Sequence, residues 1–229
     1  MLDLNPSVIY ALKSHRKVIS IPPESEKLAE LLGIIYGDGG INNAWQLVIT
    51  LNSVSDSQYA LYVQGLLESL FVIEVATRKR PGMNALVLVC SSRSLLDFLV
   101  SKGAVRGNKI AQRINIPNWI NKKSSYKRAV VRGLIDTDGC LYIHKHVTKS
   151  SSRVQNNIGL CFTNCSKDLI DFVASILTEN GITPHFSKDA KNIYLYSAKS
   201  VKKYLDIFGS SNSRILNKYK EWLKIRRGG

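Results

Sequence analysis

The sequence has little of what metal-binding or disulfide-stabilised proteins use, with four cysteines and four histidines in 229 residues. Cys90, Cys140, Cys161 and Cys165 form no Cys-x-x-Cys pair, and the histidines have no zinc-ligand spacing with them. A zinc site is therefore not expected, and an unrelated metal phosphoesterase would need more clustered His and Asp. Four unpaired cysteines indicate reduced thiols, which are typical of an intracellular compartment.

Long hydrophobic runs are also missing. No apolar run reaches 18 residues, and the N-terminal segment has no long apolar core followed by a cleavage site. Pro and Gly do not gather into a long linker. We therefore expect a soluble intracellular protein without a membrane partner. The sequence does not decide between the cytoplasm and an organelle.

Acidic residues are scarce relative to basic ones. The chain has 32 Lys and Arg against 17 Asp and Glu, a net charge of +15. Residues 1–120 carry 12 basic and 9 acidic side chains, whereas residues 121–229 carry 20 and 8. This surplus favours a polyanionic partner, since each neutralised phosphate releases counterions. The alternative is a protein that is merely basic and soluble.

The chain contains an internal repeat. Residues 27–41 read KLAELLGIIYGDGGI and residues 127–141 read KRAVVRGLIDTDGCL, with identical residues at five positions offset by 100. These are Lys27 and Lys127, Ala29 and Ala129, Gly33 and Gly133, Asp38 and Asp138, and Gly39 and Gly139. Five identities in register indicate two copies of one structural unit.

The segments that follow also match. Strand patterns at 46–51 and 158–162 precede helical patterns at 55–70 and 166–181, each opening on Ser with Asp close behind as an N-cap. Further strands are expected at 71–79, 85–91, 183–189 and 192–198, and short helices at 94–103 and 200–209. Each repeat thus reads helix, strand, strand, helix, strand, strand, helix, an α+β fold.

We expect three parts in the chain. Residues 1–23 form an N-terminal extension with an extra helix, residues 24–120 the first repeat and residues 121–229 the second. The segment 118–125 is the expected linker.

Small residues spaced by four follow one face of each matched helix. They are Ala29, Gly33 and Gly37, then Ala129, Gly133 and Thr137. Such faces allow two helices to pack closely, although one ordinary buried helix in each half remains an alternative. Each helix ends in Asp-Gly, where Gly suits a left-handed position. Packing the helices would bring Asp38 and Asp138 together, and two carboxylates beside a phosphate make a magnesium site.

The segments LLGIIYGDG (31–39) and VRGLIDTDG (131–139) resemble two copies of the LAGLIDADG motif of homing endonucleases. The resemblance implies an intron-encoded, pseudo-symmetric monomer whose two motif helices form the interface between repeats. Two antiparallel sheets, each with helices on one face, would form a basic saddle over double-stranded DNA. It also implies cleavage of both strands across the minor groove with Mg²⁺, leaving 3′ overhangs. Mn²⁺ would substitute, and Ca²⁺ would bind without supporting efficient cleavage.

Individual residues follow from the motif. The resemblance makes Asp38 and Asp138 the catalytic, metal-binding acids, and Gly37 and Thr137 the donors of backbone carbonyls to the metal. The sixth motif position keeps Asp in one copy, as Asp136, and has Tyr36 in the other.

A basic catalytic residue near the scissile phosphate is also implied in each half. Lys109, in GNKIAQRINIP, fits this place in the first half. Arg214 fits it in the second half by alignment, with Lys218 as the alternative. Asn52 and Asn164, at the ends of matched strands, would order water or contact DNA.

Strand alternation separates a core face from a DNA-facing one. In 46–52, Leu47, Ile49 and Leu51 should face the helices. Basic clusters should lie at strand ends, where DNA phosphates would pass. The predicted DNA-binding residues are Gln46, Val48, Thr50, Asn52, Arg78, Lys79, Arg80, Tyr142, His144, Lys145, Arg153, Asn157, Asn164, Lys188 and Lys191.

Two other functions are compatible with the same scaffold. One is an RNA-splicing maturase that binds intron RNA, and the other is a DNA-binding regulator without catalysis. Retention of both motif aspartates favours cleavage. The fold is also compatible with an intein origin, but no splicing blocks are visible, so we expect a free-standing enzyme.

Overall fold

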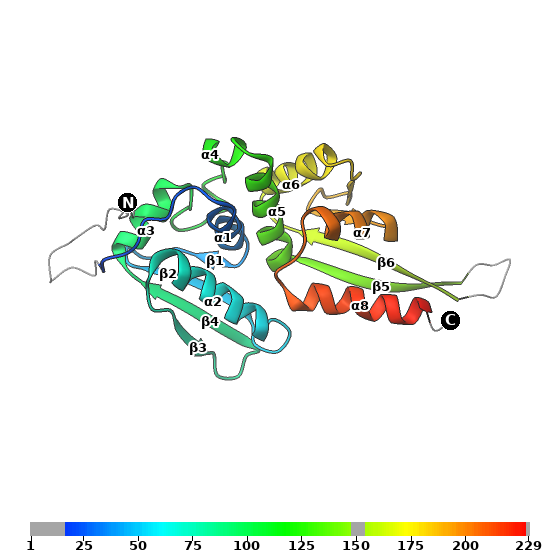
Figure 1. Ribbon diagram of the computed structural model, residues 1–229, viewed down its shortest axis with the longest axis horizontal. Coiled ribbons are helices and arrows are strands. Elements are labelled where there is room, and N and C mark those ends of the chain that lie inside the picture. Colours follow the sequence, from blue (N-terminus) through cyan, green and yellow to red (C-terminus); the bar gives the residue numbers. More distant parts are fainter. Residues whose placement is uncertain (1–16, 148–153, 228–229) are drawn as a thin grey trace, which may run out of the picture.

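The computed structural model describes residues 17–147 and 154–227 as two α+β repeats (Figure 1). Each repeat contains one four-stranded antiparallel sheet, with strand orders β1-β2-β4-β3 and β5-β6-β8-β7. The strand order is the same in both halves, which confirms the predicted fold class and the internal repeat.

The first repeat follows the predicted element order. Its elements are α1 (Glu26–Gly37), β1 (Gly39–Gly40), β2 (Gln46–Asn52), α2 (Ser57–Phe71), β3 (Ala76–Lys79), β4 (Ala85–Ser91) and α3 (Arg93–Ser101). The strand predicted from residue 71 begins only at Ala76, because Phe71 still belongs to α2 and Val72 adopts a left-handed conformation with φ of 52°. The predicted helix within 1–23 is wrong for residues 17–23, which are irregular, and its remainder lies outside the described residues.

The second repeat is similar but carries an additional C-terminal helix. Its elements are α4 (Asn118–Asn121), α5 (Ser124–Asp138), β5 (Gly139–Val147), β6 (Val154–Thr163), α6 (Lys167–Glu179), β7 (His185–Phe186), β8 (Asn192–Leu195), α7 (Ala198–Ile207) and α8 (Ser213–Arg227). The strand predicted at 183–189 shortens to two residues. Helix α8 was not predicted, although Ile215, Tyr219 and Trp222 recur at helical spacing and pack on the core.

The core lies between the helices and one face of each sheet. In β2, Leu47, Ile49 and Leu51 are buried while the residues between them are half-buried, as the alternation predicted. In β6, Ile158, Leu160 and Phe162 are fully buried. The other face of each sheet therefore carries the side chains that were predicted to face DNA.

Helices α1 and α5 lie side by side between the two sheets (Figure 1). A Cβ atom added at Gly33 would lie 2.3 Å from the carbonyl oxygen of Val130, and one added at Gly133 would lie 2.4 Å from that of Glu30. Such distances are too short for any side chain, so glycine is required where the backbones cross. The predicted helix contact is thus present, and it places both motif helices in one interface.

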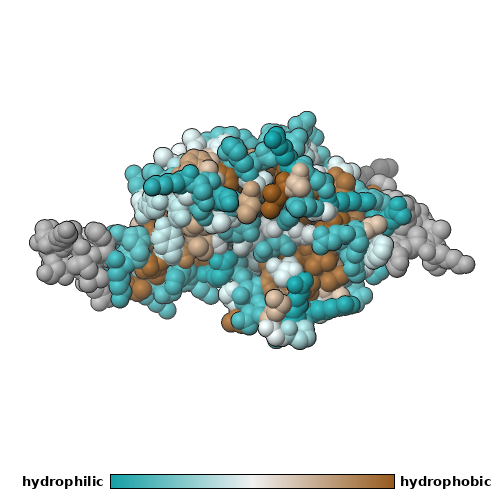
Figure 2. Space-filling view, turned by 180° about the vertical axis from the view of Figure 1, so that it is seen from behind, coloured by the Kyte–Doolittle hydropathy of each residue, from teal (hydrophilic) through white to brown (hydrophobic). Residues whose placement is uncertain are grey.

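The surface seen from behind is mainly hydrophilic (Figure 2). Its hydrophobic areas are separated from one another by polar and charged residues. None of the helices within residues 17–147 and 154–227 is long and apolar enough to cross a membrane.

Candidate active site at the ends of the motif helices

The two motif carboxylates lie at the same end of the α1–α5 interface. Asp38 caps the C-terminus of α1, and Asp138 is the last residue of α5. A Cβ atom added at Gly37 would lie 2.1 Å from Oγ1 of Thr137 and 3.2 Å from Oδ2 of Asp138. The seventh motif positions therefore touch, and both carboxylates are held close to the contact.

This arrangement raises the pKa of both acids. Burial, followed by the nearby charge of Asp138 and Asp56, raises the pKa of Asp38 to about 7. Burial raises the pKa of Asp138 to about 6, a smaller rise because Asn164 and Lys109 favour the ionised form. The amide Nδ2 of Asn164 donates to Oδ2 of Asp138 at 2.8 Å. Asn164 thus contacts a motif carboxylate, while its predicted role of ordering water or contacting DNA stays a prediction.

The glycine after each aspartate does not take the expected left-handed conformation. Gly139 is extended, with φ of −101° and ψ of 159°, and Gly39 is the first residue of β1. A Cβ atom at Gly39 would lie 2.6 Å from Cα of Ile35, and one at Gly139 would lie 2.4 Å from the carbonyl oxygen of Ile135. Glycine is required here because the strand turns back tightly against the last helical turn.

Lys109 binds the backbone carbonyl groups at the C-terminal end of α1. Its Nζ donates to the carbonyl oxygens of Ile35, Tyr36, Gly37 and Gly39 at 3.1, 2.8, 2.6 and 2.7 Å. A cation at this position neutralises the negative end of the helix dipole beside Asp38. Burial lowers the pKa of Lys109, and Asp138 and Asp38 oppose that shift. The Gly37 carbonyl, predicted to contact a metal, accepts the shortest of these hydrogen bonds.

Arg214 takes the corresponding place at the end of α5. Its Nη1 donates to the carbonyl oxygen of Gly139 at 2.9 Å, and its Nη2 to that of Asp136 at 3.3 Å. Lys218 instead forms an exposed ion pair with Glu221 at 2.9 Å. The geometry therefore favours Arg214 over Lys218 as the counterpart of Lys109. Both bases hold the carbonyl of the glycine that follows the motif aspartate.

The sixth motif position anchors the segment that carries each base. The hydroxyl of Tyr36 donates to the carbonyl oxygen of Gly103 at 3.0 Å, six residues before Lys109. Asp136, fully buried, accepts from Oγ of Ser210 at 2.5 Å and from the amide of Ser211 at 2.7 Å. Tyr and Asp thus perform the same structural task in the two repeats with different chemistry.

Two cavities open beside these groups. One, of about 260 Å³, is lined by Tyr36, Lys109, Asp138 and Asn164 among others and so lies between the two repeats. The other, of about 390 Å³, is lined by Cys140, Arg214 and Lys218 with their neighbours. Lys109 and Arg214 therefore line separate cavities.

The donor set fits a divalent ion that is shared with substrate. Within residues 17–147 and 154–227, no group of three or more His, Cys, Asp and Glu side chains is gathered. Mg²⁺ commonly takes one or two carboxylates and completes its shell with water and phosphate oxygens. Asp38 and Asp138 supply two carboxylates whose repulsion a cation would relieve. The hydroxyl of Thr137 is turned back to its own helix, on the carbonyls of Gly133 and Leu134.

The residues predicted to bind DNA lie in varied surroundings. Gln46 is half-buried and hydrogen-bonded to Asn43 and Ser91, and Asn52 accepts from the amides of residues 54 and 55 rather than contacting Asp38. Others are exposed on edge strands, hairpins and outer strand faces, namely Arg78, Lys79, Arg80, His144, Lys145, Lys188 and Lys191. Val48, Thr50, Tyr142 and Asn157 are half-buried on the outward sheet faces, and Arg153 lies outside the described residues. Their contacts with DNA remain a prediction.

The sequence reasoning missed a buried polar network between the repeats. The carboxylate of Glu30 pairs with Arg132 and accepts a hydrogen bond from Oγ of Ser211. Asp56 pairs with Arg214. The Ser-Asp pair that opens 55–70 was interpreted as an N-cap, and Asp56 does occupy that position in α2, but its carboxylate makes no capping hydrogen bond. The Ser166 cap of α6 is confirmed.

Comparison with known proteins gives one family. The family described as "LAGLIDADG-like domain" matches residues 125–219. The chain is 26% identical over 231 residues to a tRNA-splicing ligase RtcB of Methanopyrus kandleri, a match covering 90% of this chain. The chain spans only 23% of that ligase, so the similarity concerns a minor part of it.

Two solved structures share the fold. The meganuclease I-SmaMI, bound to uncleavable DNA, superposes with a TM-score of 0.59 at 12% identity, covering 86% of this chain and 89% of that one. The full-length DUF199/WhiA protein of Thermatoga maritima superposes with a TM-score of 0.54 at 16% identity, covering 90% and 63%.

The family match covers the second repeat, and the same strand order and motif helix recur in the first. The second repeat therefore matches the LAGLIDADG-like family, and residues 31–39 of the first repeat resemble a second copy of its motif.

Proposed function

We propose that this protein is a site-specific DNA endonuclease of the homing type. It would recognise a long asymmetric duplex as a monomer and cut both strands with Mg²⁺, leaving 3′ overhangs. The observation that carries this proposal is the meeting of Asp38 and Asp138 at one end of the α1–α5 interface, with a basic residue at the end of each helix. The shared fold with the DNA-bound I-SmaMI supports duplex DNA as the partner.

The proposed chemistry divides among the chain's own groups. Asp38 and Asp138 would hold the divalent ion, which when bound supplies an activated water and neutralises charge on the phosphate. The raised pKa of both acids indicates that the free site carries unfavourable negative charge. Binding a cation there would therefore relieve the unfavourable charge of the two carboxylates.

Lys109 and Arg214 would stabilise negative charge at the two scissile phosphates. Lys109 shares three ammonium protons among four carbonyl oxygens, so one of these contacts can be exchanged for a phosphate oxygen at low cost. Asn164 would fix the orientation of the Asp138 carboxylate or of a water beside it. The exposed bases on β3 and in the β7–β8 hairpin would contact phosphates along the duplex.

The proposal is tested by a cleavage assay on a randomised duplex library, with the cut ends sequenced. A single long site, cut on both strands with 3′ overhangs in Mg²⁺ and not in EDTA, is the expected result. Mn²⁺ should support cleavage, and Ca²⁺ should support binding without efficient cleavage.

The similarity to DUF199/WhiA, a name that specifies no nuclease, favours one alternative. In that case the chain would bind duplex DNA tightly and with strong salt dependence but would not cut it. Intron RNA would then be the next ligand to test, because the same scaffold would also serve a maturase.

A further inference from the structure

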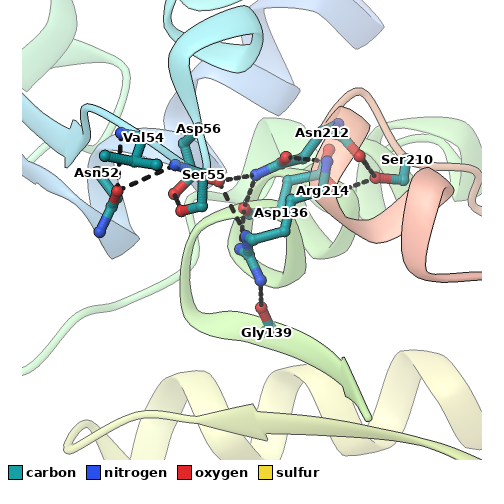
Figure 3. A network of polar contacts seen from close by, with 9 residues as sticks. All are labelled: Asn52, Val54, Ser55, Asp56, Asp136, Gly139, Ser210, Asn212 and Arg214. Atoms are coloured by element: carbon teal, nitrogen blue, oxygen red, sulfur yellow. Dashed lines mark hydrogen bonds and ion pairs between the residues drawn. The ribbon is translucent and has the colours of Figure 1, made fainter. Parts of the chain in front are cut away.

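Asp56 of the first repeat makes a buried contact with the base of the second repeat (Figure 3). Its side chain is 12% exposed, and Oδ1 accepts from Nε of Arg214 at 2.9 Å and from Nδ2 of Asn212 at 2.8 Å. The residues are 158 positions apart in the chain. This ion pair therefore crosses from α2 of one repeat to the start of α8 in the other.

The contact determines which way the guanidinium faces. Arg214 donates from Nε to Asp56, from Nη1 to the carbonyl oxygen of Gly139 and from Nη2 to that of Asp136. Guanidinium donors form a rigid planar fork, so fixing the Nε edge fixes the direction of the other two nitrogens. Without the carboxylate, only carbonyl contacts would remain to orient the charged group.

Asn212 strengthens the same connection. Its Nδ2 bridges Oδ1 of Asp56 and the carbonyl oxygen of Asp136 at 2.8 and 2.9 Å, and its side chain is fully buried. Its Oδ1 accepts from the amide of Arg214 at 2.9 Å. Asp56 thus holds both the side chain of Arg214 and the residue that positions its backbone.

Among the described residues, the centre that contains Lys109 has no such connection. The hydrogen bonds that Lys109 donates there go to carbonyl oxygens at residues 35–39, which belong to its own repeat. In the described part of the chain it forms no ion pair within 4.0 Å. Lys109 is therefore held by hydrogen bonds within its own repeat, whereas Arg214 also forms an ion pair across the interface.

We propose that Asp56 is a positioning residue for the cleavage centre that contains Arg214. The inter-repeat ion pair then sets the rate at which one DNA strand is cut, while the centre that contains Lys109 works without it. This proposal rests on the nuclease function proposed above. It makes the two strand cuts separable by a substitution at a residue whose side-chain hydrogen bonds go to Arg214, Asn212 and Ser55 rather than to the motif acids.

The test measures the cutting of each strand separately. The duplex selected from the random library is labelled on either 5′ end, and single-turnover rates are measured in Mg²⁺. The variants are Asp56→Asn, which keeps the shape but removes the charge, Asp56→Glu, which restores the charge, and Arg214→Lys. Asp206→Asn is the matched control, because Asp206 forms an exposed ion pair with Lys202 at 2.6 Å on α7.

We expect Asp56→Asn to slow one strand by about 10-fold to 100-fold, the range for losing a charge-assisted hydrogen bond. A nicked intermediate should accumulate, and the slowed strand should be the one that Arg214→Lys slows. Asp56→Glu should recover part of the rate, and Asp206→Asn should cut both strands normally. The double variant Asp56→Asn with Arg214→Lys should be no slower than Arg214→Lys alone, since both act through one contact.

Three results would overturn the proposal while leaving the nuclease function intact. These are equal slowing of both strands, unchanged cutting of both, or additive effects in the double variant. Unfolding temperatures identify a variant that is merely unstable, in which case Arg214→Lys tests the contact from the other side. Failure of the wild-type protein to cut any duplex would instead overturn the proposed function, and this proposal with it.

Discussion

Replacing either motif aspartate should stabilise the free protein at alkaline pH while removing its activity. Asp38 is the sharper case, since burial and the charges of Asp138 and Asp56 raise its pKa from 3.8 to about 7. At about 1.4 kcal/mol per pH unit, that shift corresponds to an upper bound of about 4 kcal/mol for ionising Asp38 in the folded protein. Because Asp38 stays partly exposed, solvent screening lowers the expected effect to about 2 kcal/mol.

The sign and pH range follow from the raised pKa. Between pH 3.8 and about 7 the folded protein binds more protons at Asp38 than the unfolded chain does, so stability falls as pH rises through this range. Asn imitates the neutral acid at every pH. The gain from Asp38→Asn should therefore be small near pH 4, grow up to about pH 7 and stay constant above it. Asp138→Asn should give a smaller gain, because its pKa is raised only to about 6.

Denaturant unfolding in EDTA at pH 4 and pH 8 measures this effect, with Asp206→Asn as the exposed control. At pH 8, about 2 kcal/mol corresponds to roughly 4–8 °C in unfolding temperature for a chain of this size. A variant no more stable than wild type at pH 8, or a gain of equal size at both pH values, would refute the reasoning.

Two further predictions concern packing around the site. Gly133→Ala should destabilise the protein by about 1–3 kcal/mol, because its Cβ would lie 2.4 Å from a backbone oxygen of Glu30. At the exposed position Gly65 an added Cβ atom would meet no atom within 4 Å, so Gly65→Ala should instead stabilise the protein by about 0.5–1 kcal/mol. If thermal unfolding showed that both substitutions destabilise the protein equally, the packing explanation would be wrong. Tyr36→Phe leaves the carbonyl of Gly103 without its 3.0 Å partner and should cost about 1–2 kcal/mol. It should also slow cleavage by loosening the segment that holds Lys109, whereas an unchanged cleavage rate would show that this anchor is not needed.

The repeated sequence motif predicted the parts of the candidate site that occur once in each repeat. The matched segments, with small residues at a spacing of four, predicted that α1 and α5 pack together and bring Asp38 and Asp138 to one place. Resemblance to the motif also led to Lys109 and Arg214, which the structure places at the ends of the two helices. The helix contact, the two aspartates and the two basic residues could be predicted because each depends on the spacing and type of residues within one short segment.

Contacts between distant segments were not predicted. Asp56 looked like part of a helix cap because it follows Ser at the start of a helical pattern, and only the folded chain brings Arg214 within reach. The glycines after the motif aspartates were assigned to the wrong conformation, since crowding against the preceding turn is a tertiary effect that Asp-Gly does not reveal. Asn52 and Asn164 occupy matched positions yet differ, because only Asn164 reaches a motif carboxylate.

The central claim is that Asp38 and Asp138 together form a metal-dependent centre for cutting both DNA strands. The most direct test measures Mg²⁺-dependent cleavage of the selected duplex by wild type, Asp38→Asn and Asp138→Asn, with binding measured in parallel in Ca²⁺. Each substitution should abolish double-strand cleavage while binding largely survives. Cleavage of both strands at the wild-type rate by either variant would contradict it.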